Sequence, residues 1–435
     1  MIFADDFRAE PWWWHAAPRP EEAPAPLPAE TDVAVVGSGY TGLSCALTLA
    51  RGGRDVAVLE ADTPGFGASS RNAGFVGKVC KHGLGELVDT LGESQAVAIY
   101  RELGAAWDYV AELVEHEQIA CHFTRCGRFV ATATAKQYES LARDLELRER
   151  LLGEPFEMVP HAEQRREIGS DRFRGGAIMP SLGSIHPGLY HLGLLERARN
   201  AGAAVFGSTP VTGIRRERGR FEVRTGRGTV GAREVVVATN GYTGRATPWH
   251  YRRVVPFRGF MIATEPLSTE QLERALPSHR TYHDYVNNID FLRRAPDEPR
   301  ILFGGLTGTM TGDLALMGRR LHARLVATFP ELEGVEWEYH WAGWPAITRD
   351  HLPRLFALDR GVYAGLGYNG RGVASATLMG QQLANAILDE AEPLVQVRGP
   401  ERFAFHRFRQ AGISFRLLTG SLLDGLDRLG RRGAA

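Results

Sequence analysis

The residues with the clearest chemical meaning are the glycines of Gly37-Ser38-Gly39-Tyr40-Thr41-Gly42 and the carboxylate of Glu60. In a dinucleotide-binding motif the first glycine permits a tight turn, the second lets backbone approach a pyrophosphate, and the third lets helix and strand pack closely. The acid that closes the next strand binds a ribose hydroxyl. Because Glu60 is acidic and not basic, a 2′-phosphate is disfavoured, and the motif favours FAD or NAD over NADP.

The sequence around this motif predicts the elements that would position it. Val33 to Val36 is a β-branched run typical of a buried parallel strand. Apolar residues from Leu43 to Ala50 recur at helical spacing, and Val56 to Leu59 predicts the next strand. The unit is therefore a strand, a glycine-rich turn, a helix and a second strand.

A second unit of the same kind lies near the other end of the chain. The strand expected at Val362 to Gly365 leads into Gly367, Gly370 and Gly372, which precede a helix whose amino end could hold an anion or a carbonyl oxygen. The loop from Gly65 to Gly77 is rich in small residues. It could pass beside a large flat ligand or could be an ordinary surface loop, and composition alone favours the latter.

Arg258 is the single cation of the segment Val254 to Thr264, where we expect a strand, and it lies between two phenylalanines. It could bind a substrate carboxylate bidentately, and a structural ion pair is an equally good interpretation. With strands expected at Ile289 to Arg294 and Ile301 to Gly305, this region predicts a mostly antiparallel second sheet.

Composition excludes several classes of function. The 435 residues carry 51 basic and 51 acidic side chains, which gives no electrostatic case for a nucleic-acid partner. The four cysteines form no CxxC pair or metal-ligand cluster, so we expect reduced thiols, no bound metal and a cytoplasmic protein. No run of apolar residues is long enough to predict a transmembrane helix. The oligomeric state stays open.

The two ends of the chain carry segments outside these motifs. The Pro-rich start predicts an extended arm that Trp12, Trp13 and Trp14 anchor on the body or on a partner subunit. The basic, aromatic segment near the C-terminus could be a membrane-surface helix, although packing on the protein or oligomerisation is the stronger interpretation.

Taken together, these motifs resemble those of the FAD-dependent amine and D-amino acid oxidoreductase family. The resemblance runs in family order from about residue 30 to 390 and rests on VAVVGSGYTGLSCALTLA with Glu60, GFGASSRNAGFVG, SIHPGLYHLGLLERARNAGAAVF, VVVATNGYT, VVPFRGFMIATEP, ILFGG, TRDHLPRL and GLGYNGRGVASATLMGQQLA. The Ser-Arg-Asn-Ala-Gly loop and the aromatic arm are most similar to the gamma-glutamylputrescine oxidase branch.

The resemblance implies roles for particular residues. Gly37, Gly39 and Gly42 would surround the diphosphate, Glu60 would hold the ribose, and Val211 would contact adenine through its backbone. The full set implied to hold FAD is Gly37, Ser38, Gly39, Tyr40, Thr41, Gly42, Glu60, Ala61, Ser69, Ser70, Arg71, Asn72, Ala73, Gly74, Val211, Ala238, Thr239, Asn240, Gly241, Gly343, Gly367, Tyr368, Asn369, Gly370 and Gly372. Residues expected to face the substrate are Arg71, Asn72, Arg258, Tyr285, Asn288, Trp344 and Tyr368, with His186 as either a ligand or a turn residue.

Members with covalent flavin use a Cys or His beside the ring. Because Ser70-Arg71-Asn72 and Gly343-Trp344 contain neither, we expect dissociable FAD. The expected reaction oxidises the C–N bond of a small amine or amino acid, with hydride passing to flavin N5 and oxygen or another acceptor taking the electrons. Two alternatives stay open: a flavin dehydrogenase of a hydroxy acid or polyol that feeds a membrane quinone, and a non-catalytic flavoprotein.

The expected fold is α/β, α+β overall, with a discontinuous Rossmann-like domain and a mostly antiparallel substrate domain. An N-terminal arm covers 1–29 and a helical tail covers 393–435. We expect the FAD-binding domain at 30–105, 184–250 and 336–392, and the substrate domain at 106–183 and 251–335.

Overall fold

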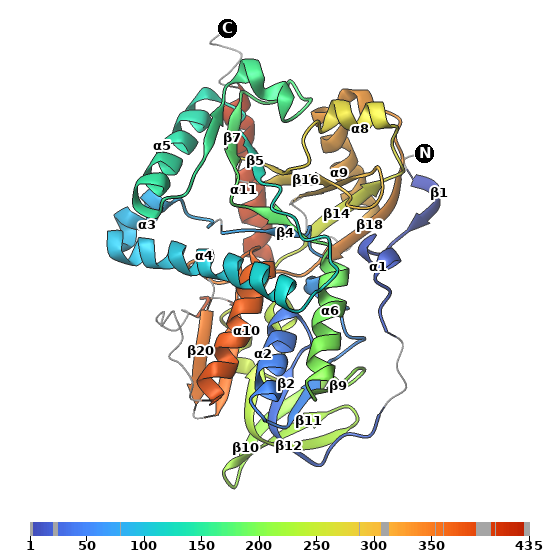
Figure 1. The fold of residues 1–435 in the computed structure, drawn as a ribbon, viewed down its shortest axis with the longest axis vertical. Helices are drawn as coiled ribbons and strands as arrows, with labels where there is room; N and C mark the ends of the chain where they lie inside the picture. Colours follow the sequence, from blue (N-terminus) through green and yellow to red (C-terminus); the bar gives the residue numbers. More distant parts are fainter. Residues whose placement is uncertain are drawn as a thin grey trace.

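The computed structural model describes residues 3–20, 25–78, 80–286, 288–305, 313–352, 354–359, 361–388, 402–404 and 406–429. Within them the buried β-branched runs form the centre of an eight-stranded sheet, at the lower end of the molecule in Figure 1. Its parallel strands lie in the order β9-β3-β2-β12-β21. Their bounds are β2 Glu30–Val36, β3 Val56–Leu59, β9 Ala204–Phe206, β12 Gly228–Val237 and β21 Val362–Leu366. This is the Rossmann-like order, so the expected fold class is confirmed.

Alternate side chains of the central strand enter different cores. Val33 and Val35 pack against helices α2 (Tyr40–Arg51), α4 (Glu93–His116), α6 (Pro187–Asn200) and α10 (Gly372–Leu388). Ala34 and Val36 instead face a core that includes the hairpin strands β10 (Val211–Glu217) and β11 (Arg220–Thr225). Both faces of the sheet are therefore covered, as a parallel sheet requires.

Strand β12 pairs with different neighbours along its length. It is one strand, in which Gly228 to Ala232 pair with β11 while Val235 to Val237 pair with β21. A single strand thus continues from the exposed hairpin into the core. The eighth strand, β20 (Arg354–Asp359), pairs antiparallel with β21.

The second sheet has nine strands, in the order β1-β18-β14-β17-β16-β15-β5-β7-β6, and lies at the upper end in Figure 1. All its pairs are antiparallel except β1 with β18 and β15 with β5, so the mostly antiparallel prediction is confirmed. The bounds are β1 Phe3–Arg8, β5 Arg128–Ala131, β6 Glu157–Val159, β7 Gly176–Met179, β14 Gly259–Thr264, β15 Thr281–Asp284, β16 Asp290–Arg294, β17 Ile301–Gly305 and β18 Trp337–Gly343.

Two expectations about this half need correction. The third FAD-binding segment was expected to begin at residue 336, but β18 lies between β1 and β14 in the nine-stranded sheet. The segment Val254 to Thr264 is not one strand, because Phe257 and Arg258 separate β13 (Val255–Pro256) from β14. Strand β13 pairs with β19 (Ala346–Ile347) outside both large sheets.

The remaining elements are helices around the two sheets and one short strand pair. The N-terminal arm contains β1 and α1 and is not extended throughout. The pair is β4 (Phe75–Val76) with β8 (Gly183–Ser184). The helices are α1 Trp13–Ala16, α3 Leu84–Leu91, α5 Ala135–Leu152, α7 Pro248–Tyr251, α8 Thr269–Ala275, α9 Leu314–Thr328 and α11 Arg409–Leu429.

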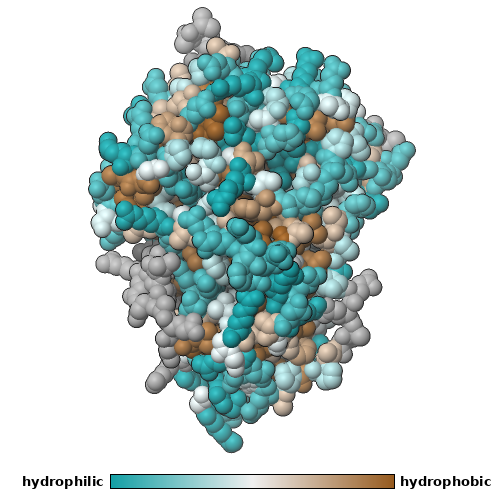
Figure 2. All heavy atoms as spheres, viewed as in Figure 1, coloured by the Kyte–Doolittle hydropathy of each residue, from teal (hydrophilic) through white to brown (hydrophobic). Residues whose placement is uncertain are grey.

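Part of the predicted C-terminal tail, 393–401, lies outside the described residues, and α11 follows it. None of the helices in the described ranges has the length and apolar character needed to cross a membrane. Hydrophilic residues predominate on the face shown in Figure 2, where hydrophobic residues form separate patches.

Candidate cofactor and substrate site

Three of the segments predicted to hold a cofactor follow neighbouring parallel strands. Gly37 follows β2, Ala238 follows β12, and Gly367 follows β21. Ala238 N–H donates to the carbonyl of Val36 (2.9 Å), and Gly367 N–H donates to Oδ1 of Asn240 (3.0 Å). The segments therefore lie side by side at the carboxyl edge of the sheet, where open α/β folds bind their ligands.

The glycines of the first turn are required by close backbone approach. Gly37 has φ of +101°, which disfavours a side chain, and a Cβ there would lie 3.1 Å from the carbonyl oxygen of Ala238. A Cβ on Gly42 would lie 1.9 Å from the carbonyl oxygen of Gly37. Gly39 is the N-cap residue of α2, so no side chain there covers the amino end of the helix.

Glu60 lies directly beyond β3 and points toward this turn. Its Oε2 accepts hydrogen bonds from Ser38 N–H (2.8 Å) and Ser38 Oγ (2.7 Å). The carbonyl of Glu60 accepts from Thr209 N–H (2.6 Å), which brings the start of β10 at Val211 to the same strand end. The exposed Ala61 follows Glu60.

The small-residue loop packs on the amino end of α2. Ser69 Oγ accepts from Tyr40 N–H at 3.0 Å. The Asn72 amide donates to the carbonyls of Ala68 and Ser69, and its Oδ1 accepts from Gly74 N–H (2.8 Å). Asn72 thus shapes its own loop, which turns back at Gly74, where φ is +71°.

Arg71 is held inside the structure instead of extending into solvent. Its guanidinium lies 4.5 Å from the Trp14 ring and 4.6 Å from the Phe66 ring, and it donates to the carbonyls of Phe66 (2.7 Å) and Ala342 (3.2 Å). Burial lowers the pKa of Arg71. Trp341 Nε1 donates to the Arg71 carbonyl (2.9 Å), so β18 is tied to the loop through both residues.

Arg258 and Trp344 lie together beside that junction. The Arg258 guanidinium is 4.4 Å from the Trp344 ring centroid, and Gly259 pairs with Gly343 in the sheet. A Cβ on Gly241 would lie 1.8 Å from the Trp344 carbonyl oxygen. The two sheets therefore meet at one place, close to Arg71. The residues that meet there are Gly241, Gly343, Trp344 and Arg258.

The turn after β21 is organised by internal contacts. The Tyr368 hydroxyl hydrogen-bonds to Thr41 Oγ1 (2.5 Å) and donates to the Gly365 carbonyl (2.6 Å), and burial raises its pKa. Asn369 Oδ1 accepts from Thr348 N–H at 3.0 Å. Tyr368 is 5% exposed, so its position favours a role in joining α2 to the turn over contact with substrate.

The other expected substrate residues form a separate group. Tyr285 and Asn288 lie between β15 and β16; Tyr285 is partly exposed, whereas Asn288 is buried and its Nδ2 donates to the Leu417 carbonyl of α11 (2.8 Å).

His186 is the N-cap of α6, where Nδ1 accepts from Leu189 N–H (3.1 Å). Burial lowers the pKa of His186 to about 3, so it is neutral and its position favours the turn interpretation.

Comparison with known proteins now identifies the family. The profile of the family described as "FAD dependent oxidoreductase" matches residues 32–386. The chain belongs to this FAD-dependent oxidoreductase family. The segments that meet at the carboxyl edge all fall inside the matched range.

Relatives and solved structures agree with this assignment. The chain is 33% identical over 404 residues to gamma-glutamylputrescine oxidoreductase of Escherichia coli (strain K12), covering 92% of this chain and 93% of the relative. It is 25% identical over 367 residues to glycine oxidase of Geobacillus kaustophilus, covering 82% and 92%. The predicted family is thereby confirmed, and so is the predicted similarity to the gamma-glutamylputrescine oxidase branch.

The solved structures show the same fold. Glycine oxidase from Geobacillus kaustophilus superposes with a TM-score of 0.69 at 23% identity, covering 86% of this chain and 100% of that one. L-Proline dehydrogenase from P. horikoshii gives 0.71 at 18% identity, covering 85% and 96%.

In this FAD-dependent oxidoreductase, the residues at the carboxyl edge of the eight-stranded sheet are suited to bind FAD. The turn leaves little room for a side chain at Gly37 and none at Gly42, and the helix that follows it has a glycine N-cap. A backbone cradle at a helix amino end is the arrangement that binds a diphosphate. The predicted FAD dependence is thus confirmed by the family and consistent with the geometry.

Sequence reasoning missed several residues that build this site. Trp13 Nε1 donates to the Asn72 carbonyl, and Trp14 Nε1 donates to Ser70 Oγ, both at 2.8 Å. The adjacent indoles did indicate an anchor, but the acceptors lie more than fifty residues away in the sequence. Trp341 and Thr348 carried no signal of their own, because their partners, the Arg71 carbonyl and the Asn369 side chain, belong to other segments of the chain.

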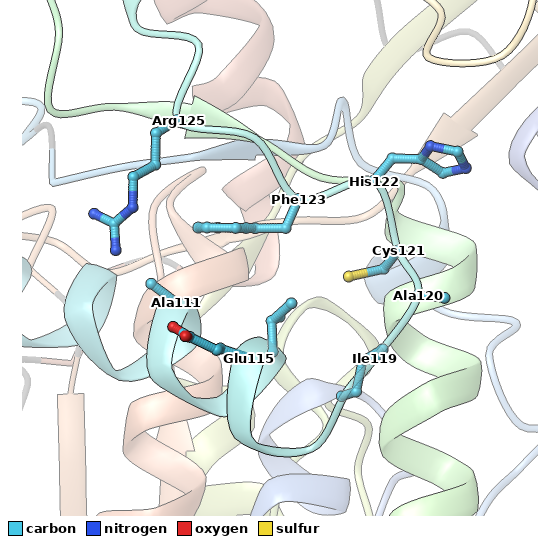
Figure 3. Close-up of a pocket in the computed structure, with 9 residues that line it drawn as sticks. Ala111, Glu115, Ile119, Ala120, Cys121, His122, Phe123 and Arg125 are labelled. Atoms are coloured by element: carbon cyan, nitrogen blue, oxygen red, sulfur yellow. The ribbon is translucent and has the colours of Figure 1, made fainter.

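A cavity of about 460 Å³ lies elsewhere, between the end of α4 and the segment that follows it (Figure 3). Its lining includes Glu115, Cys121, Phe123 and Arg125. Among the described residues that line it, none belongs to the predicted cofactor or substrate set. The site is therefore assigned from the glycine-rich edge and not from this cavity.

Proposed function

We propose that this FAD-dependent oxidoreductase oxidises the C–N bond of an amine or amino acid. Bound FAD supplies the hydride acceptor, N5, for oxidation of the carbon beside a neutral amine nitrogen, and water hydrolyses the resulting imine. The relatives named gamma-glutamylputrescine oxidoreductase and glycine oxidase support an amine substrate. Oxygen or another acceptor takes up the electrons.

The observation that carries the proposal is the convergence of the turns after β2, β12 and β21 beside the Arg258 and Trp344 pair. We propose that the turn residues, Glu60 and the loop from Ser69 to Gly74 hold FAD in an extended form. The eight-stranded sheet then forms the FAD-binding domain, and the nine-stranded sheet forms most of the substrate domain. The substrate would bind where Trp344 and Gly343 join the two.

Within this arrangement the chain itself has three tasks. The glycine turns position the cofactor without side chains that would displace it. Trp344 provides an aromatic wall, and Arg258, fixed over that wall, provides a cation for a substrate carboxylate. Water exclusion by the Trp14, Phe66 and Arg71 stack would protect the reacting carbon.

The proposal is tested by anaerobic mixing of the yellow holoprotein with N-methyl amino acids, D-amino acids, polyamines and glutamylated polyamines. Bleaching of the flavin by at least one amine is expected. A flavin that no amine on this panel bleaches, or that a hydroxy acid bleaches instead, would contradict the proposal.

The role of Arg258 can be separated from the reaction itself. Arg258→Met should raise KM for carboxylated amines by about tenfold or more, while FAD content and turnover of amines without a carboxylate stay unchanged. Arg258→Lys keeps the charge but loses the planar group over Trp344, so an intermediate KM is expected. Unchanged kinetics in Arg258→Met would exclude a substrate clamp and leave amine oxidation itself untouched.

A further inference from the structure

The outer face of α11 is apolar, in contrast to an ordinary solvent-facing helix. Phe415, Leu418 and Leu422 are 70%, 59% and 60% exposed. With the exposed Ala411 they follow one another at intervals of four, three and four residues, which places all of them on one side of the helix. A helix facing only water would be expected to carry polar side chains at these positions.

The opposite side of α11 is the one attached to the protein. There the Leu417 carbonyl accepts from Asn288, and Gly420 is buried. Arg416, at the edge of the exposed side, lies 2.9 Å from Nε2 of His351. The helix is therefore attached to the protein through contacts that do not involve Phe415, Leu418 or Leu422. These three side chains are exposed although the helix is packed on the protein.

Further exposed apolar side chains extend this surface. Phe408, immediately before the helix, is 55% exposed, and Leu423 is 54% exposed. We name the surface formed by Phe408, Phe415, Leu418, Leu422 and Leu423 the α11 face. A group of exposed apolar side chains on one helix and the residue before it marks a contact with a membrane or another molecule more often than a single exposed leucine does.

Arginines gather where α11 begins. The segment before the helix packs on residues 251–254: Phe403 N–H donates to the Arg252 carbonyl (3.2 Å), and the Arg409 guanidinium lies 4.8 Å from the Tyr251 ring. The pKa of Arg253 is lowered by burial and by the charges of Arg402 and Arg252. The arginines of this group, which we name the basic cluster, are Arg252, Arg253, Arg402, Arg407 and Arg409.

The basic cluster has no acidic counterpart in the described part of the chain. None of its arginines forms an ion pair with a carboxylate of the described residues, although the structure contains many ion pairs elsewhere. Arg252, Arg402 and Arg407 are exposed. Among the described residues, this surface therefore combines arginines that pair with no carboxylate and an apolar face.

We propose that the α11 face and the basic cluster dock this protein on an anionic lipid surface, with the helix lying in the plane of the headgroups. Phe415, Leu418 and Leu422 enter the boundary between headgroups and acyl chains, and the arginines contact lipid phosphates. A second copy of the chain could cover the apolar face but would bring another basic cluster, whose arginines pair with no carboxylate of the described residues. An anionic lipid surface satisfies both features, so it is the occupant that the charges favour.

The test measures sedimentation of the holoprotein with vesicles of phosphatidylcholine containing a minor fraction of phosphatidylglycerol, and with phosphatidylcholine alone. We expect binding that requires phosphatidylglycerol and weakens at high salt. The variant Phe415→Ser, Leu418→Ser, Leu422→Ser should bind the anionic vesicles about tenfold or more weakly. Arg402→Gln with Arg407→Gln should reduce the preference for phosphatidylglycerol while leaving the apolar face intact.

Matched controls replace exposed residues outside both the α11 face and the basic cluster. Leu91→Ser removes an exposed leucine of α3, and Arg215→Gln with Arg218→Gln removes two exposed arginines of the β10 hairpin region. Both should bind the vesicles as the parent does, and flavin absorbance and far-UV circular dichroism should show that all variants are folded.

Two results would overturn the docking proposal. One is a parent protein that does not sediment with anionic vesicles, or a triple-serine variant that sediments as well as the parent. The other is a parent that is dimeric without vesicle binding and becomes monomeric in the triple-serine variant, which would assign the α11 face to a second copy. Since the readout is binding, either result leaves amine oxidation to be judged by flavin bleaching.

Discussion

Gly42 is the residue at which a single added carbon should do most harm to the cofactor site. Its Cβ would lie 1.9 Å from the Gly37 carbonyl oxygen, so Gly42→Ala must push α2 away from β2. Overpacking of this kind costs about 1–3 kcal/mol. We expect Gly42→Ala to lower the melting temperature and to lose most of its FAD on purification, measured as the ratio of flavin to protein absorbance.

Gly104 provides the matched control. It lies inside α4, and a Cβ there would meet nothing within 4 Å. Gly104→Ala should keep its flavin and should be neutral or more stable by about 0.5–1 kcal/mol, because glycine is unfavourable inside a helix. Equal flavin content in both alanine variants would refute the close approach of helix and strand.

The attachment of FAD is also decided by single residues. We expect dissociable FAD because the two segments expected beside the ring, Ser70-Arg71-Asn72 and Gly343-Trp344, contain no Cys or His. Acid precipitation should therefore release all of the yellow colour into the supernatant, and the free flavin should have the mass of FAD. Flavin that stays with the pellet would show a covalent bond. The first position to examine would then be Cys80, whose Sγ accepts a hydrogen bond from Arg371, the residue directly before α10.

At the residue scale, the sequence predicted the roles that depend on neighbouring residues and did not predict those that depend on distant ones. The glycine roles follow from a strand, turn and helix that are adjacent in the chain, so spacing was sufficient. The surroundings of Arg71 could not be predicted, because Trp14, Phe66 and Ala342 come from distant parts of the sequence. For the same reason the hydrogen bonds by which Tyr368 and Asn72 shape turns could not be predicted, and their contact with substrate stays a prediction.

At the scale of elements, the start of α6 is sensitive to acid. His186 caps the helix from a fully buried position, and its pKa is lowered to about 3 by burial and by the charges of His122 and Arg293. Its ordinary value is 6.5. Between these two values His186 is protonated in the unfolded chain and neutral in the folded chain. The free energy of unfolding therefore falls as pH decreases from about 6.5 toward 3, by about 1.4 kcal/mol per pH unit at most.

His186→Asn isolates this effect, since asparagine is a good N-cap but does not titrate. Loss of the ring contacts with Trp12 and Trp13 should lower the melting temperature by a similar amount at every pH. The parent should lose additional stability between pH 7 and 5 that the variant does not lose, measured by thermal unfolding in matched buffers. A parallel decline in both proteins would show that His186 is not the group responsible.

Most elements were predictable, and the exceptions have physical causes. The runs Val33 to Val36 and Val235 to Val237 are buried on both faces, which leaves a clear apolar signal. The break between β13 and β14 at Arg258 could not be predicted. The sequence of this segment is that of a strand, and it does not show that Arg258 lies between two strands and stacks on Trp344. The continuity of β12 was also hidden, since pairing with β11 and with β21 follows from partners distant in the chain.

At the scale of the whole molecule, the nine-stranded sheet draws strands from the arm, from both inserted segments and from β18. The sequence predicted that two domains interleave, because the second glycine-rich unit had to rejoin the first. It could not predict that β18 belongs to the nine-stranded sheet, since strand order between distant segments leaves no local pattern. The remaining domain boundaries stay predictions.

The N-terminal arm is the part that joins these halves from outside, and its indoles provide a test. Trp13 and Trp14 each donate a hydrogen bond to the loop that we propose lies along the flavin, whereas Trp12 Nε1 has no hydrogen-bond partner in the described residues. Trp13→Phe with Trp14→Phe should cost about 1–3 kcal/mol and should weaken FAD retention during dialysis, because the loop loses two of its outer contacts. Trp12→Phe should retain FAD as the parent does, since it removes a buried N–H that is not hydrogen-bonded to any described group. If the double variant keeps its flavin while losing stability, the arm supports the fold alone; if Trp12→Phe loses flavin equally, packing of the indoles matters and their hydrogen bonds do not.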